Sequence, residues 1–383
     1  REKTDAVLRE IEQVICEEER EPDTEQTLST EEFASRVERI KERMDTENLS
    51  KQQRRAVRDV ERKSLPRMKE YERHIAIMGE RNSYARSDPD ATFMRMKEDA
   101  MLNGQLKPGY NVQIATENQF ITNYGIFQRP ADTGTLIDFL ESFHKKYGLH
   151  SREIVADAGY GSQQNYEYMF SKGMIPYVKY NYFHKEQTRA FRNNPFLQQN
   201  LRYDSSTDEF TCPAGKSMVP ICSQNPKSES GYRAHTRLYQ ASGCTECPLR
   251  KECHNAEGNR IIRVNHRLNE YKEKVRKLLT SERGILHRSR RPIEPEAVFG
   301  QIKADRMFRR FRLRSLEKVN IEFGLVALAH NLRKMAANTP LSGPYNVALS
   351  QTGRCRSAKY PLPSIPKITA VRYIIGIHIK VAA

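Results

Sequence analysis

The first 85 residues consist mainly of charged positions, with apolar residues recurring at helical spacing. The apolar residues three or four positions apart are Phe33, Val37, Ile40 and Met44. This spacing predicts one apolar face on a helix. Ser29, followed three residues later by Glu32, has the pattern of a capping box at a helix start. We interpret residues 1–85 as a charged helical arm, and favour a solvated linker over an element that contacts DNA.

From residue 86 the pattern changes to the alternating and continuous apolar runs that are typical of strands. "YNVQIAT" and "QFITNYGIF" flank a polar turn, which indicates a hairpin. An amphipathic helix at 133–148, the buried strand of "IVADAGYGS", a second helix and the strand "IPYVKY" follow. This order predicts an α/β fold with helices packed on a mixed sheet. Residues 86–184 would form its first part and 266–337 its second.

Two further segments differ in composition from this core. Residues 185–265 are polar and rich in turn residues, so we expect an insertion that burial alone does not order. Residues 338–383 contain many Pro, Ser and Gly residues and are predicted to be a disordered tail.

The charge balance indicates an anionic partner. The 383 residues include 64 Lys and Arg against 48 Asp and Glu, a formal net charge of +16, and nucleic acid is the commonest partner of such a chain. No apolar run is long enough to span a membrane. The seven cysteines, without a signal peptide, favour the cytosol, where clustered thiols indicate metal more often than disulfides.

Carboxylates lie at positions that suit catalysis. Asp157 follows directly after the apolar strand Ile154–Ala156, at the edge of a sheet where active groups gather. Alone it reads as a turn former. Together with the acids of "SDPDA" and "IEPEAVFGQIK" it predicts a cluster that repulsion and desolvation disfavour unless a divalent metal neutralises it. Two Mg²⁺ ions held by Asp and Glu suit displacement at phosphorus.

Several long motifs, in order, resemble the DDE transposases of bacterial insertion sequences, in the branch with a cysteine-containing insert between the second and third acids. The motifs are "DPDATFMRMKEDAMLNGQLKPGYNVQIAT", "IVADAGYGSQQNY", "FTCPAG", "CTECPLRKEC", "PIEPEAVFGQIK" and "VALAHNLRKM". They span roughly residues 85–336. The resemblance implies an RNase H-like core and metal-dependent cleavage and transfer of DNA strands.

The resemblance assigns the three catalytic, metal-binding acids to Asp88, Asp157 and Glu296, with Asp90 as the alternative first acid. Glu296 is followed seven positions later by Lys303, which on a regular helix would place both on one side. The family also has an arginine four positions before the glutamate, but position 292 is proline. Asp132 is interpreted as a helix N-cap rather than as a metal ligand.

Basic residues near the third acid form the expected DNA-binding surface. Arginines interleave with apolar residues in "KADRMFRRFRLRSLEK", so the apolar side chains would pack while the arginines reach phosphates. The expected DNA-binding residues are Arg290, Arg291, Lys303, Arg306, Arg309, Arg310 and Arg312.

The cysteines predict a structural zinc site. Cys244, Cys247 and Cys253 have the spacing C-x2-C-x5-C, and Cys212 could supply a fourth sulfur. Cys222 and His254 are alternative ligands. An iron–sulfur cluster and a set of reduced thiols without metal are the other interpretations.

The resemblance therefore implies a DNA transposase that requires Mg²⁺, with Mn²⁺ as a substitute, and that acts as a homodimer on transposon ends in the bacterial cytoplasm, associated with the nucleoid. The alternatives are an inactive remnant that only binds DNA, and a nuclease without strand transfer.

Overall fold

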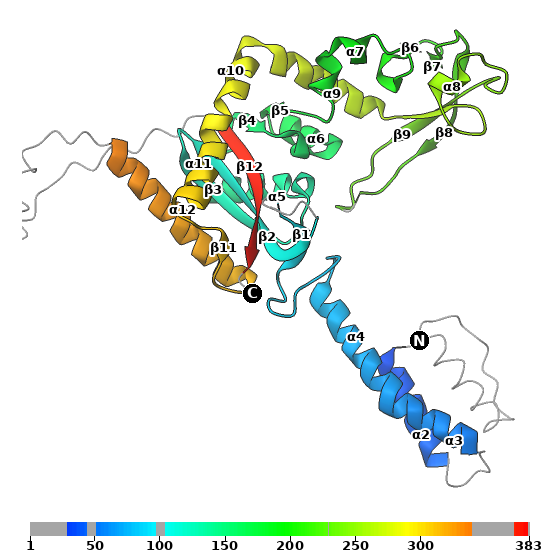
Figure 1. Ribbon diagram of the computed structural model, residues 1–383, viewed down its shortest axis with the longest axis vertical. Coiled ribbons are helices and arrows are strands. Elements are labelled where there is room, and N and C mark those ends of the chain that lie inside the picture. Colours follow the sequence, from blue (N-terminus) through cyan, green and yellow to red (C-terminus); the bar gives the residue numbers. More distant parts are fainter. Residues whose placement is uncertain (1–28, 44–50, 97–103, 229, 339–370, 382–383) are drawn as a thin grey trace, which may run out of the picture. The chain divides into compact units, whose positions relative to one another are not determined.

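The computed structural model describes residues 29–43, 51–96, 104–228, 230–338 and 371–381, arranged in two units that divide after Tyr84 (Figure 1). Met44, the last residue of the expected apolar stripe, lies outside the described residues. Among the described helices, none combines the length and apolar composition of a membrane span.

The first unit is a helical hairpin. It contains α2 (Thr30–Arg43), α3 (Lys51–Asp59) and α4 (Leu65–Met78), with the last two joined by a π-helical turn at Val60–Ser64. The expected capping box is present, because Ser29 N–H donates to Glu32 and Glu32 N–H donates to Ser29 Oγ. The apolar core of the unit consists of Phe33, Val37, Ile40, Val57, Val60, Leu65 and Met68.

The second unit contains a seven-stranded mixed sheet. Its strands are β1 (Thr92–Arg95), β2 (Leu106–Glu117), β3 (Phe120–Phe127), β4 (Glu153–Ala156), β5 (Ile175–Val178), β11 (Arg310–Phe311) and β12 (Val371–Val381). β2 pairs antiparallel with β3 on one side and with β12 on the other, and β12, β4 and β5 run parallel to one another. The sequence predicted this mixed α/β architecture.

Helices pack on both faces of this sheet (Figure 1). One apolar cluster joins β4 and β5 to α5 (Leu136–Tyr147), α6 (Gln163–Ser171) and α9 (His266–Thr280). The other joins β2 to α11 (Ala297–Gly300) and α12 (Leu316–Asn338). Alternation along β2 produces the two faces, because Ala115 belongs to the first cluster and Ile114 to the second.

The end of the chain differs from the expectation of a disordered tail. Residues 371–381 form β12, a strand between β2 and β4, and the expected tail outside these residues is not described. The segment "VRYIIGIHIKV" is rich in β-branched residues, and such a segment is stable in the middle of a sheet. The Pro- and Ser-rich composition of the preceding residues led us to overlook this strand pattern.

The insertion also differs from the expectation, because it has a core of its own. It forms an antiparallel five-stranded meander of β6 (Arg202–Asp204), β7 (Glu209–Thr211), β8 (Ser217–Gln224), β9 (Thr236–Ala241) and β10 (Ile261–Val264). One face of this sheet buries Leu201, Phe210, Met218, Tyr239, Ala241, Ile262 and Val264. The short helices α7 (Arg189–Arg192) and α8 (Arg250–Cys253) flank it. The strands are short, so their alternation was hidden among the polar turns.

Candidate active site

Asp157 lies where a fully buried strand ends. All four residues of β4 are buried, and the side chain of Asp157 then accepts a hydrogen bond of 2.8 Å from the Ala158 N–H at the start of a 3-10 turn, Ala158–Tyr160. Gly161 packs this turn against the end of β5, since a Cβ there would lie 2.4 Å from the Lys179 carbonyl oxygen. The sheet therefore holds a half-exposed carboxylate (51% exposed) rigidly at its edge.

Glu296 is brought to Asp157 by a guanidinium that contacts both. Arg291 Nη1 lies 3.0 Å from Asp157 Oδ1, and Arg291 Nη2 lies 3.5 Å from Glu296 Oε1. Both carboxylates are about half exposed, whereas the arginine side chain is only 8% exposed. The second and third acids predicted from the sequence thus converge on one buried cation.

A π-helical turn explains why the arginine is displaced by one position in the sequence. Between α10 (Glu282–Arg290) and α11, residues Pro292–Glu296 wind as a π-helix, in which hydrogen bonds join residues five rather than four positions apart. Arg291, five positions before Glu296, therefore occupies the place that an arginine four positions before it would have on an α-helix. A second π-turn at Gln301–Asp305 means that seven residues no longer equal two whole turns, so the expected alignment of Glu296 with Lys303 does not follow.

The neighbouring acid Glu294 has a structural role. It is 7% exposed, and its Oε2 accepts a hydrogen bond of 2.9 Å from the Gln119 N–H in the β2–β3 turn. Asn118 and Gln119 in that turn both have left-handed backbone conformations, as a two-residue hairpin requires. Glu294 therefore clamps the hairpin and leaves Glu296 as the acid that faces the site.

Positive charge surrounds Asp157. Burial alone would raise the pKa of Asp157, but Arg291, the Ala158 N–H and Lys179 together hold this pKa below its usual range. Burial, followed by Arg291, lowers the pKa of Lys179. Burial also lowers the pKa of His184, as do Lys179 and Arg288. Sequence reasoning missed Lys179, His184 and Arg288, since in a basic chain nothing in the sequence distinguishes them from the many other basic residues.

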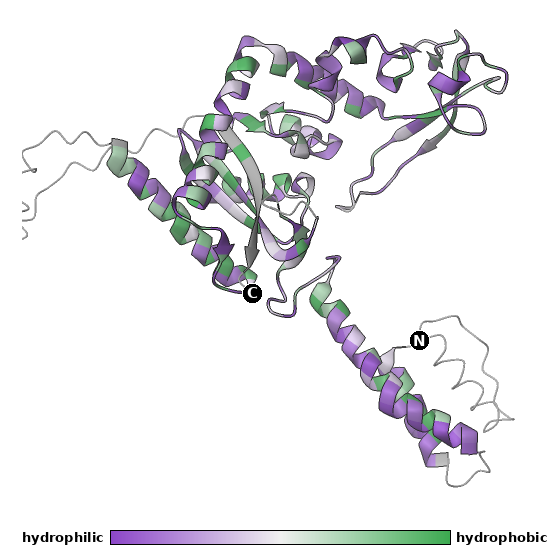
Figure 2. Cartoon of the chain, in the orientation of Figure 1, coloured by the Kyte–Doolittle hydropathy of each residue, from purple (hydrophilic) through white to green (hydrophobic). Residues whose placement is uncertain are grey.

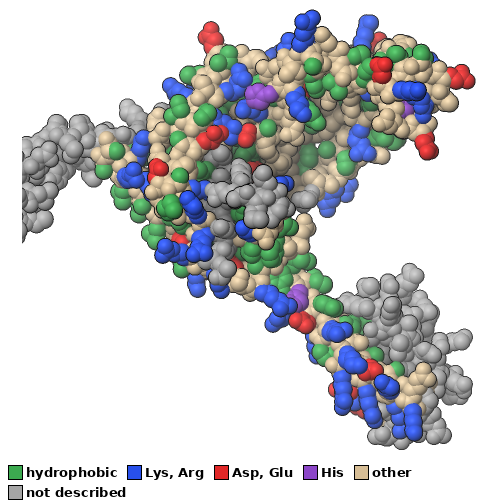
Figure 3. Space-filling model, in the orientation of Figure 1, with side chains coloured by type: hydrophobic (Ala, Val, Ile, Leu, Met, Phe, Trp, Pro, Cys, Tyr) green, Lys and Arg blue, Asp and Glu red, His purple; other side chains and the backbone are tan. Residues whose placement is uncertain are grey.

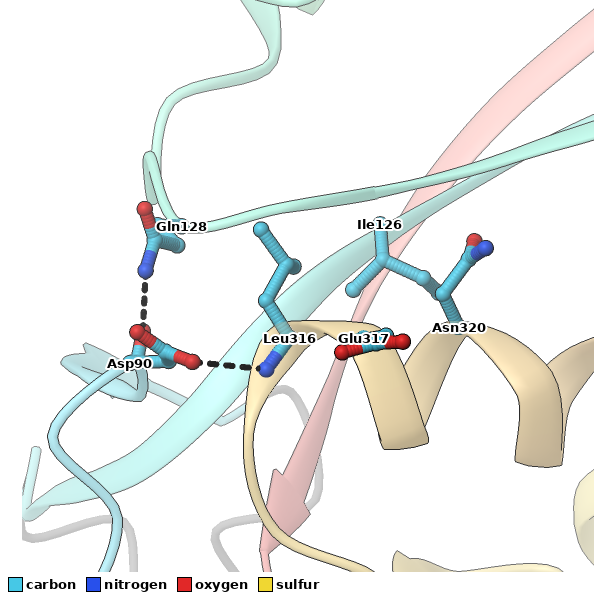
Figure 4. A pocket seen from close by; sticks show the side chains of 6 residues that line it. All are labelled: Asp90, Ile126, Gln128, Leu316, Glu317 and Asn320. Carbon is cyan, nitrogen blue, oxygen red and sulfur yellow. Dashed lines mark hydrogen bonds between the residues drawn. The ribbon is translucent and has the colours of Figure 1, made fainter.

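Asp88 and Asp90 are not part of this group. Asp88 is 1% exposed and accepts hydrogen bonds from Tyr110 Oη (2.9 Å) and the Ser315 N–H (3.1 Å). Asp90 Oδ2 accepts from the Leu316 N–H at the start of α12, next to an open cavity of about 570 Å³ (Figure 4). Both aspartates therefore hold the first turn of α12 in place.

Strand register separates Asp88 from Asp157. Tyr110, which Asp88 contacts, is level with Ile379 of β12, whereas Asp157 extends the β4 register two residues past Val155, to the level of Ile375. Four positions of a strand span roughly 13 Å. In the described part of the chain, no three His, Cys, Asp or Glu side chains are placed so that they could hold one metal ion. The expected convergence of three acids is thus limited to two.

Asp132 was expected to be an N-cap, which the structure contradicts. Its Oδ1 accepts hydrogen bonds from Asn111 Nδ2 (2.8 Å) and Gln113 Nε2 (3.0 Å), on the face of β2 that also carries Ala115. A Cβ atom added at Gly159 would lie 3.6 Å from Asp132 Oδ2. Asp132 therefore borders the Asp157 turn through a network of side-chain amides, which its position after a "RPA" turn did not reveal.

Among the expected DNA-binding residues, Arg291 contacts both of the paired acids. Arg290, Arg309, Arg310 and Arg312 are exposed, and Lys303 and Arg306 are partly exposed. Lys and Arg side chains outnumber acids on the face of the molecule drawn in Figure 3. The exposed arginines lie outside the apolar core, as the interleaved pattern predicted. Of the apolar residues between them, Phe311 is buried, but Met307 and Leu313 are exposed, so the expected packing holds only in part.

The four cysteines line one small cavity, of about 20 Å³, in the insertion. The Lys216 N–H donates to Cys212 Sγ (3.3 Å), and Arg260 donates to Cys244 Sγ through its backbone N–H (3.4 Å) and to Cys253 Sγ through Nη1 (3.1 Å). Cys247 and His254 also line the cavity, whereas Cys222 is an exposed residue of β8. Cys222 is therefore outside the group, and His254 stays adjacent to it.

Residues 211–336 match the family model of the transposase DDE domain. The match includes Arg291 and Glu296 and ends within α12, while Asp157 lies before it. It supports the resemblance to insertion-sequence DDE transposases. No curated protein and no solved structure matches the chain.

Proposed function

We propose that the chain, of which residues 211–336 match the transposase DDE domain, cleaves DNA at the ends of an insertion sequence and joins the freed ends to target DNA. The observation that supports this most is the convergence of Asp157 and Glu296 on Arg291 at the edge of a mixed sheet. This arrangement places two carboxylates and several basic groups where a phosphodiester can approach.

The donor types at this site fit a hard divalent cation. Asp157 and Glu296 present half-exposed carboxylate oxygens, the ligands that Mg²⁺ prefers, and two such ligands are enough for an ion that keeps several waters. A bound Mg²⁺ or Mn²⁺ would supply Lewis acidity at the reacting phosphate. Arg291, Lys179 and Arg288 would orient the DNA backbone around the two acids.

The arrangement also favours one other candidate function, a transposase remnant that binds DNA without cleaving it. The supporting observation is that Asp88 is engaged at α12 rather than beside the other two acids. A cleavage and joining assay separates the two. Wild-type protein with Mg²⁺ should nick DNA that carries the parent element's ends and join the 3′ ends to a second DNA. Salt-sensitive binding without either product would support the remnant.

We propose further that Cys212, Cys244, Cys247 and Cys253 hold a structural zinc ion. In the described part of the chain no three of these side chains are placed to hold one ion, so zinc binding would require them to move closer together. Support comes from the cavity that the four cysteines line together, from the hydrogen-bond donors directed at three of the sulfurs, and from Arg260, whose charge would compensate thiolates. Purified protein should then contain about one zinc per chain, lost in Cys244→Ser but retained in Cys222→Ser. Wild-type protein without zinc would contradict this proposal.

A further inference from the structure

The loop before α5 lies against the turn that follows Asp157. In this loop, the Thr133 hydroxyl donates a hydrogen bond of 2.6 Å to the Gly159 carbonyl oxygen. Asn165 joins the same two segments, because its Nδ2 donates to the carbonyl oxygens of Thr133 (2.9 Å) and Tyr160 (2.8 Å). Asn165 is 1% exposed, so its side chain is shielded from water. The loop is therefore attached to the backbone of this turn at two points.

Asp132, in the same loop, is connected to the turn through the side chain of Gln113. Hydrophilic as well as hydrophobic positions occur on the strands of the central sheet (Figure 2). The Gln113 amide nitrogen donates to Asp132 Oδ1 (3.0 Å) and to Asn111 Oδ1 (2.9 Å), and Gln113 Oε1 accepts from the Tyr160 hydroxyl. Asn111 and Gln113 are fully buried, and Tyr160 is 1% exposed. Both N–H groups and the oxygen of this amide are therefore engaged away from water.

The charge of Asp132 determines which way this amide points. A carboxylate can only accept hydrogen bonds, so the Gln113 nitrogen must face Asp132 and the Gln113 oxygen must face Tyr160. Hydrogen bonds to an ionised group are also about twice as strong as those between neutral groups. Without the carboxylate the amide is free to turn round, and the Tyr160 hydroxyl then faces a donor instead of an acceptor.

Tyr160 fixes the backbone next to Asp157. The Tyr160 N–H donates to the Asp157 carbonyl oxygen (3.1 Å), which closes the 3-10 turn. The Ala158 N–H of the same turn donates to the Asp157 carboxylate (2.8 Å). The direction of this carboxylate therefore depends on the turn, and the buried Tyr160 side chain holds the turn in place.

We propose that Asp132 is a positioning residue for Asp157, which acts through Gln113 and Tyr160, and that it thereby sets the affinity of the site for a divalent cation. This inference rests on the proposed function, in which Asp157 holds the cation. Groups that orient a metal ligand without touching the metal typically contribute a factor of about 10 to 100 to metal affinity. Asp132 needs no contact with the cation in this role.

Titration calorimetry of the full chain with Mn²⁺, without DNA, tests the proposal. Asp132→Ala should bind Mn²⁺ about tenfold more weakly than wild type, whereas Asp132→Asn, which keeps an acceptor oxygen for Gln113, should lose less. Asp138 is an exposed acid on α5, so Asp138→Ala is the matched control and should bind Mn²⁺ like wild type. Urea denaturation checks that each variant is folded.

A double-mutant cycle tests the path between Asp132 and Asp157. Tyr160→Phe removes the hydroxyl that Gln113 binds, and should weaken Mn²⁺ binding by a similar factor. Asp132→Ala should then cause little further loss in the Tyr160→Phe protein, because the connection is already broken. Equal losses from Asp132→Ala in the two backgrounds would overturn the path through Tyr160.

Asp157→Asn separates this inference from the proposed function. If wild-type protein and Asp157→Asn take up Mn²⁺ alike, the proposed metal site is wrong, and this inference is wrong with it. If Asp157→Asn abolishes Mn²⁺ binding while Asp132→Ala binds as tightly as wild type, only this inference is overturned.

Discussion

At the residue scale, one arginine determines how the two acids are held. Arg291 is buried and contacts both Asp157 and Glu296, so each carboxylate keeps a partner before any metal or DNA binds. Paired carboxylates at the surface of a fold would otherwise repel each other. In the proposed function, the same guanidinium would contact a phosphate of the DNA backbone.

In this account Asp88 stabilises the fold. In Asp88→Ala, the buried Tyr110 hydroxyl and the Ser315 N–H lose their acceptor, so we expect a loss of about 1–3 kcal/mol in the free energy of unfolding. Asp88→Asn keeps an acceptor oxygen and should lose less. Urea denaturation measures both. If Asp88→Asn has wild-type stability yet no cleavage activity at all, Asp88 acts in catalysis.

At the element scale, α10 positions Arg291 through a buried histidine. His287 on α10 is 4% exposed and lies 3.0 Å from Glu153 on β4, which also binds Arg283. This contact ties the helix that ends just before Arg291 to the strand that ends just before Asp157. Both sides of the candidate site are therefore fixed to the same strand.

This contact predicts a pH dependence. Burial lowers the pKa of His287, and Arg283 lowers it further, although Glu153 opposes the shift. The pKa of His287 is therefore lower in the folded state than in the unfolded state, where it is near 6.5. Above about pH 6.5 the histidine is neutral in both states, and the fold keeps its full stability. The contribution is lost as the pH falls from the unfolded value through the folded-state pKa. The free energy of unfolding should decrease from about pH 7 to about pH 5, and less so in His287→Gln, which does not titrate. An equal decrease in both proteins would exclude His287 as the cause.

Some elements of the fold could be predicted from the sequence and others could not. The hairpin, α5 and the strand before Asp157 follow from local periodicity, and the structure contains them. The position of β12 between β2 and β4 could not be predicted, because pairing between strands so far apart in the chain leaves no local sequence pattern. Likewise, Asp157 and Glu296 were chosen from motifs, but the π-turn that brings Arg291 to them cannot be inferred from residue spacing.

At the scale of the whole molecule, the exposed arginines before α12 should dominate DNA affinity. Replacing Arg309, Arg310 and Arg312 with Ala should weaken binding to all sequences alike. It should also reduce the slope of log affinity against log salt by about 0.9 for each phosphate that the variant no longer neutralises.

The first unit offers a matched control for that experiment. Replacing the exposed Arg55, Arg58 and Arg62 of the helical hairpin removes the same charge, and should leave the slope nearly unchanged if this unit is a solvated linker. If only the hairpin variant lowers the slope, the DNA surface lies on the first unit.

The central claim is that Asp157 and Glu296 form the catalytic pair, and it is tested most directly by cleavage of DNA carrying the parent element's ends. With Mg²⁺, Asp157→Asn and Glu296→Gln should each lose cleavage by at least about 100-fold while binding the same DNA nearly as well as wild type. Glu270→Gln, an exposed acid on α9, should cleave normally. Cleavage by Asp157→Asn or Glu296→Gln at the wild-type rate would contradict the account.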